Sequence, residues 1–177
     1  VLDSENNSYR VGMLDLAAFN SSAVDGINKL ILDYRAWIQS KRSEVFELDE
    51  KFKEIGSIHL DACEKFLTDI ESGWQLFNGD PDVKKCLCAA SKAMNQQRGA
   101  YNAPLREVVE DKSSELGYSV PARQPGSQDQ EHWRPFQIAF ILASIKKITN
   151  VNSRDALNCG VDVIWMPTGG GKTEAYL

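Results

Sequence analysis

Apolar residues recur at helical spacing in two long stretches near the start of the chain. The first stretch begins at Ser21 or Ser22, either of which can cap a helix, and runs to about Leu48. The second begins near Ser57 and ends at the turn signal Asn78-Gly79. The spacing predicts two amphipathic helices, and we expect them to pack on each other because each has one apolar face.

A third helix is predicted directly after this turn. Asp80 is a typical N-cap and Pro81 a typical first helical residue, and an apolar stripe continues to Met94. We therefore assign residues 1–98 to an N-terminal helical domain. Within it, residues 1–20 stay uncertain, because the segment from 8 to 16 alternates like a strand while Gly12 weakens either assignment.

Residues 99–131 interrupt the helical pattern. They are rich in Gly, Pro, Ser, Gln and charged residues, which predicts a polar linker or insert. Only residues 104–112 have a sequence able to form a short helix.

Helical spacing returns from Trp133 to about Thr149, and Pro135 can enter this helix at its first turn. The sequence VDVIW, at 161–165, is a short run rich in β-branched and aromatic residues and predicts a buried parallel strand. A glycine loop and the start of another helix complete the order of elements. The fold class that follows is mainly α, with an α/β domain beginning at the C-terminal end.

The glycine loop has the chemistry of a phosphate-binding site. Gly169, Gly170 and Gly171 leave backbone N–H groups unobstructed at a helix N-terminus, where an anion is favoured. Lys172 can reach the outer phosphates of a nucleotide, and the Thr173 hydroxyl can complete the shell of a magnesium ion. The alternative is a glycine-rich turn that binds no ligand.

The strict phosphate-loop pattern begins with glycine, and this chain has Met166 at that position. Helicase-type loops tolerate this departure and commonly read P-T-G-x-G-K-T, as residues 167–173 do. The predicted strand before the loop supplies the structural context that the motif requires.

A second motif, W-R-P-F-Q, spans Trp133 to Gln137. In superfamily 2 helicases an R-P-[FY]-Q helix start precedes the phosphate loop, and its glutamine hydrogen-bonds the adenine edge while neighbouring groups flank the base. By that resemblance Arg134, Phe136 and Gln137 are candidate nucleotide-binding residues. The alternative is that Trp133 and Phe136 are core residues and that Arg134 and Gln137 only cap a helix.

Together, W-R-P-F-Q and P-T-G-G-G-K-T-E-A-Y-L resemble the helicase-like subunit of the bacterial anti-phage DISARM system. The segments H-L-D-A-C-E-K-F (59–66) and A-A-S-K-A-M-N-Q-Q (89–97) resemble its helical region, so the likeness covers roughly residues 57–177. It implies an ATP-dependent DNA helicase or translocase with ATP and Mg²⁺ as cofactors, and residues 132–177 are then the truncated start of its first RecA-like lobe.

The residues that would carry this activity lie in the two motifs. Lys172 and Thr173 are the predicted catalytic residues, and Thr173 is the predicted magnesium ligand. The predicted nucleotide-binding residues are Arg134, Phe136, Gln137, Thr168, Gly169, Gly170, Gly171, Lys172, Thr173 and Glu174. For Glu174 a helix-capping role is favoured over that of a catalytic base.

The chain begins at Val1 and ends four positions after Thr173, so we expect a fragment of a longer protein. On the resemblance, the remaining ATPase and DNA-contacting motifs would follow residue 177, and we do not expect the fragment to hydrolyse ATP. DNA would be bound by those later parts, because residues 1–130 hold 15 Lys and Arg against 21 Asp and Glu and are a poor match for phosphate.

Two other functions stay open. Residues 21–98 could be a scaffold that docks a partner subunit of a defence complex, or the protein could be a phosphate-loop ATPase that does not act on nucleic acid. The chain has no apolar run of the roughly 18 residues that a membrane span requires. Its four cysteines lie among helical patterns, which favours a reducing, cytoplasmic location without membrane contact.

Overall fold

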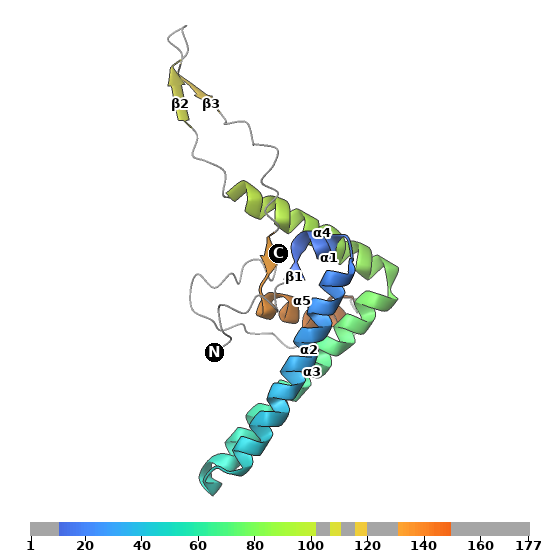
Figure 1. The fold of residues 1–177 in the computed structure, drawn as a ribbon, viewed down its shortest axis with the longest axis vertical. Coiled ribbons are helices and arrows are strands. Elements are labelled where there is room, and N and C mark those ends of the chain that lie inside the picture. The colour runs from blue at the N-terminus through green and yellow to red at the C-terminus, as the bar shows by residue number, and fades with distance from the viewer. Residues whose placement is uncertain (1–10, 102–106, 111–115, 120–130, 150–177) are drawn as a thin grey trace.

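The computed structural model describes residues 11–101, 107–110, 116–119 and 131–149 (Figure 1). The protein is mainly α-helical, as predicted. Its elements are β1 (Val11–Gly12), α1 (Met13–Ala17), α2 (Ser21–Phe46), α3 (Glu50–Gly79), α4 (Pro81–Tyr101), β2 (Glu107–Glu110), β3 (Leu116–Ser119), β4 (His132–Trp133) and α5 (Pro135–Thr149). The predicted strand at 161–165 and the glycine loop lie outside the described residues.

Helices α2 and α3 form a long antiparallel hairpin (Figure 1). The N-cap of α2 is Asn20, whose Oδ1 accepts the N–H of Ala23 at 3.1 Å, so the prediction of Ser21 or Ser22 as the cap was wrong. Asn20 is favoured because its amide also donates to Asp15 Oδ1, at 2.7 Å. A cap with a second partner in α1 fixes the angle at which α2 begins.

Helix α3 begins at Glu50, seven residues before the predicted start near Ser57. The extra turns include Gly56, which weakens a helical pattern in the sequence. In the structure α2 approaches α3 closely at this glycine, because a Cβ on Gly56 would lie 3.0 Å from both methyl carbons of Val45. Packing between the two helices therefore outweighs the low helix propensity of glycine.

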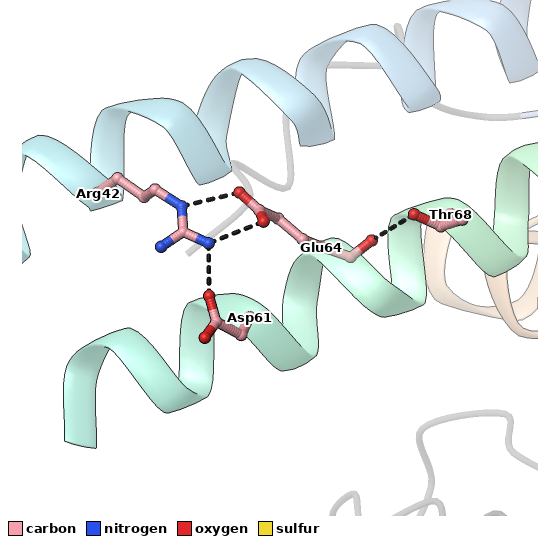
Figure 2. A network of polar contacts seen from close by, with 4 residues as sticks. All are labelled: Arg42, Asp61, Glu64 and Thr68. Atoms are coloured by element: carbon pink, nitrogen blue, oxygen red, sulfur yellow. Dashed lines mark hydrogen bonds and ion pairs between the residues drawn. The ribbon is translucent and has the colours of Figure 1, made fainter. Parts of the chain in front are cut away.

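An ion-pair network joins the two helices of the hairpin (Figure 2). Arg42 on α2 donates through Nε to Glu64 Oε1 at 2.8 Å and through Nη2 to Asp61 Oδ1 at 2.6 Å. Its Nη2 also lies 2.7 Å from Glu64 Oε2, so the contact with Glu64 is bidentate. Hydrogen bonding from Arg42 holds the pKa of Glu64 below its usual value.

Helix α4 begins where the sequence predicts. Asp80 is its N-cap, and its Oδ1 accepts the N–H groups of Asp82 at 2.9 Å and Val83 at 3.2 Å. Pro81 occupies the first helical position, where a backbone N–H would have no partner within the helix, so the missing N–H of proline costs nothing. The turn from α3 into α4 is therefore encoded locally.

The short helix predicted at 104–112 was wrong. Residues 107–110 form β2, which pairs antiparallel with β3 in the register Glu107↔Ser119. The β-branched pair Val108-Val109 favours a strand once a partner is present, and that partner lies further along the chain, beyond the local pattern. Residues 11–17 likewise divide between β1 and α1, which explains why neither a strand nor a helix alone fitted that segment.

The core forms where α5 packs on the hairpin. On α3, Ile70 and Phe77 are buried, and on α5, Ile138 and Leu142 are fully buried. The helices meet closely at Gly73, where a Cβ would lie 1.8 Å from the carbonyl oxygen of Leu142. Burial of this apolar face is the main favourable term in the fold. None of the helices in the described part of the chain is both long and apolar enough to cross a bilayer.

Candidate functional site

The start of α5, which carries the W-R-P-F-Q motif, is fixed to the N-terminal part of the chain by a short sheet. Strand β4 pairs antiparallel with β1, so Trp133 lies opposite Val11 and His132 opposite Gly12. The N–H of Met13 extends the ladder by donating to the carbonyl of Glu131 at 2.8 Å. Residues more than 100 positions apart therefore set where the motif lies.

Helix α4 holds the same segment from a second side. Trp133 Nε1–H donates to Ser91 Oγ at 2.9 Å, and both side chains are buried. Glu131 donates its backbone N–H to Asn95 Oδ1 at 3.0 Å, and its carboxylate accepts from Arg98 Nε at 3.0 Å. Each buried polar group in this cluster has a partner, which a stable buried site requires.

Gln137 has a defined orientation at the start of α5. Its side chain is fully buried, and its Oε1 accepts the backbone N–H of Arg134 at 2.8 Å. This is the bond that the third residue of a helix makes to the N-cap in a capping box. The carbonyl of Arg134 in turn accepts from the N–H groups of Gln137 and Ile138, at 3.0 and 3.2 Å. This capping bond is what the alternative interpretation of the motif proposed for Arg134 and Gln137, and the adenine-binding role of Gln137 stays a prediction.

The other residues of the motif differ in exposure. Trp133 is a core residue, 2% exposed, as the alternative interpretation of the motif proposed. Phe136 is half-buried and the Arg134 side chain is exposed, so these two offer surface beside the helix start. A guanidinium and an aromatic ring are both able to lie against the face of a base.

The remaining predicted site residues lie outside the described residues. They are Thr168, Gly169, Gly170, Gly171, Lys172, Thr173 and Glu174. Their assignment to phosphate and magnesium binding remains a prediction from the sequence. In the segments that the structure does describe, no group of three metal-ligating side chains comes together.

Sequence reasoning missed the α4 residues that position the motif. Ser91, Asn95 and Arg98 follow at intervals of four and three and so share one face of α4, next to the apolar positions Leu87 and Met94. Polar residues in an apolar helical stripe were the available signal. Their partners could not be read from the sequence, because Glu131 and Trp133 lie 33 to 42 residues further along the chain.

The fold and this site define a mainly α-helical protein in which a helical hairpin packs on the helix opened by W-R-P-F-Q. No family model matches the chain. The chain is similar to the DISARM protein DrmA of Bacillus paralicheniformis, with 31% identity over 154 residues. The matched region is 87% of this chain and 12% of the relative, so the chain spans about an eighth of the length of that protein.

Proposed function

We propose that this chain is the N-terminal helical region and the nucleotide-binding start of an ATP-dependent DNA helicase or translocase of superfamily 2, acting in bacterial anti-phage defence. The observation that carries the proposal is the sequence P-T-G-G-G-K-T after a predicted buried strand, downstream of a helix opened by W-R-P-F-Q. The similarity to DrmA over 87% of the chain supports the role in defence.

The geometry of the described residues supports nucleotide binding at the start of α5. A side-chain amide that recognises a base should be held in one orientation before binding. Each mobile side chain that becomes ordered on binding lowers the affinity. The capping bond from the Arg134 N–H fixes the Gln137 amide, which is fully buried, and the accessible surface beside it belongs to Arg134 and Phe136. The pairing of β4 with β1 and the bond from Trp133 to Ser91 on α4 fix the backbone at the start of α5, which carries that amide.

The roles of the remaining groups follow from their chemistry. Lys172 would neutralise charge on the outer phosphates, and the Thr173 hydroxyl would ligate Mg²⁺. DNA would be contacted by other parts of the full-length protein, because the hairpin of residues 21–79 holds 7 Lys and Arg against 11 Asp and Glu.

The test measures ATP hydrolysis by the full-length protein with and without duplex DNA. We expect DNA to stimulate turnover and Lys172→Ala to lower it by on the order of 100-fold or more, the effect of removing a charge-stabilising group from a transition state. The matched control is Lys92→Ala, which removes an exposed lysine from α4. Cells that carry Lys172→Ala should also lose their protection against phage.

Each result distinguishes between the functions left open by the sequence. ATP hydrolysis that does not respond to DNA would favour a phosphate-loop ATPase that does not act on nucleic acid. Hydrolysis that is the same in Lys172→Ala and in the unchanged protein would refute the motor proposal.

A further inference from the structure

The hairpin of α2 and α3 ends in a tip, residues 45–58, that carries an unusual amount of exposed apolar surface. Its exposed apolar side chains are Phe46 (79% exposed), Leu48 (43%), Phe52 (49%), Ile55 (48%) and Ile58 (54%). Single exposed apolar residues are ordinary, but five of them within 14 residues at the end of one hairpin are typical of an interaction site. The tip lies at the bottom of Figure 1, away from α1, α4 and α5.

The tip is a packed structure. Gly56 allows α3 to approach α2 so closely that a Cβ at this position would lie only 3.0 Å from both methyl carbons of Val45. Further along the hairpin, the bidentate contact of Arg42 with Glu64 holds the two helices together (Figure 2). A surface fixed in this way before binding loses little conformational entropy when a partner arrives.

The two phenylalanines lie on either side of the turn. Phe46 is the last residue of α2 and Phe52 lies in the first turn of α3. Lysine ammonium groups lie over both rings, Lys53 at 5.5 Å from the Phe46 centroid and Lys51 at 4.7 Å from that of Phe52. Aromatic side chains, phenylalanine among them, are enriched in the buried centre of protein interfaces.

Charge at the tip indicates what kind of partner it fits. Residues 45–58 hold four carboxylates against two lysines. Glu50 pairs with Lys53 at 2.9 Å, whereas Glu47, Asp49 and Glu54 form no ion pair with any residue that the structure describes. Unpaired carboxylates around an apolar centre match an apolar patch rimmed by Lys and Arg.

The same charge disfavours other occupants. Nucleic acid and anionic lipid would be repelled by a hairpin with a net charge of −4. A second copy of the tip would bring like charges together, which costs affinity. A protein surface with a basic rim satisfies both the apolar centre and the acidic margin.

We propose that the hairpin tip docks a partner protein through an apolar patch rimmed by Lys and Arg on that partner, with Phe46 and Phe52 as its anchors and Glu47 and Glu54 as its charged margin. The proposal does not depend on ATP hydrolysis, because none of the tip residues belongs to the W-R-P-F-Q or P-T-G-G-G-K-T motif. The alternative function of a docking scaffold covered residues 21–98 as a whole. The proposal assigns the docking of a partner to residues 45–58.

The experiment uses the full-length protein, and the probes are the proteins encoded beside its gene, each purified separately. Binding is measured by calorimetry without nucleotide. We expect one of these proteins to bind, Phe46→Ser and Phe52→Ser each to weaken binding by at least about tenfold, and the double variant Glu47→Lys and Glu54→Lys to weaken it and reduce its salt dependence. Ile148→Ser is the matched control, because Ile148 is 67% exposed on α5, outside the tip.

A photoreactive phenylalanine at position 46, introduced in the host cell, provides an independent readout. Cross-linking to the protein that binds in solution supports the proposal. Cross-linking to the same chain, to a second copy, to nucleic acid or to lipid overturns it, as does unchanged affinity in the tip variants or the absence of binding by every probe. If Lys172→Ala had no effect on ATP hydrolysis, the motor proposal would fail while these binding results would stand. The two proposals can therefore be refuted independently.

Discussion

Replacement of Gly73 by alanine tests whether the close approach of α3 and α5 stabilises the fold. The added Cβ would lie 1.8 Å from the carbonyl oxygen of Leu142 and 2.7 Å from its carbonyl carbon. Both atoms belong to the backbone of α5, so no side-chain rotation can relieve the overlap. To reach even 3.0 Å, the two helices must separate by about 1.2 Å.

The expected loss of stability follows from the contacts that this separation opens. A gap of roughly 1 Å forfeits a quarter to a half of the dispersion energy of the atoms on either side. Ile138, Leu142 and Ile145 are buried in this region, and each fully buried side chain of this size contributes about 1.5–3 kcal/mol. The loss is therefore about 1–4 kcal/mol, and the higher helix propensity of alanine offsets about 1 kcal/mol of it.

The assay is thermal unfolding of the purified 177-residue chain followed by circular dichroism. After this offset the net cost is about 0–3 kcal/mol, which corresponds to a fall in Tm of up to roughly 6–12 °C for a chain of this size. Gly79→Ala is the matched control, because nothing lies within 4 Å of a Cβ at that helical position. We expect that variant to melt at the same temperature as the unchanged chain or slightly above it.

A second variant shows which atoms are responsible. Leu142→Ala removes the side chain of Leu142 and keeps its carbonyl, so it should not restore stability to Gly73→Ala. If Gly73→Ala melts with the control Gly79→Ala, or if truncation of Leu142 rescues it, the argument that two backbones meet at this glycine is refuted.

Three further predictions concern polar contacts. Trp133→Phe leaves the buried hydroxyl of Ser91 without its donor and should cost about 1–3 kcal/mol of stability. Adding Ser91→Ala should recover part of that cost in a double-mutant cycle of Tm values. Fully additive effects would show that the bond contributes nothing. Asp80→Ala removes the cap from two N–H groups of α4 and should destabilise the chain by about 0.5–2 kcal/mol in urea unfolding, with Asp80→Asn close to the unchanged chain. Because Arg42 lowers the pKa of Glu64 in the folded state, this carboxylate stabilises the fold above the pKa of a free glutamate, and the stabilisation is lost as the pH falls through the lowered pKa. The difference in Tm between the unchanged chain and Glu64→Gln should therefore shrink from about pH 7 to about pH 3, and a constant difference would contradict this.

Helices with a local signal were predictable from the sequence. The apolar stripe of α5 and the Asp80-Pro81 start of α4 were each visible within a few residues, and the structure confirms both. The start of α3 was not visible, because the residues that extend it, among them Phe52 and Ile55, are about half-exposed and Gly56 weakens the pattern.

For the candidate site, the sequence identified the motif and the structure supplied its supports. Arg134, Phe136 and Gln137 were found because a short motif carries its own residue types and spacing. Ser91, Asn95 and Arg98 were missed because their contacts with Trp133 and Glu131 join segments 33 to 42 residues apart. Hydrogen-bond partners at such separations leave no periodic trace in the sequence.

By itself the sequence determined that this protein is built of amphipathic helices and that it carries a phosphate-loop motif, because periodicity and short motifs depend on neighbours within a few residues. Only the tertiary structure decided that β1 pairs with β4, that Gly73 meets the backbone of Leu142 and that none of the residues it describes covers the hairpin tip. These features depend on which distant surfaces bury one another, and that choice is made by the packing of the whole chain.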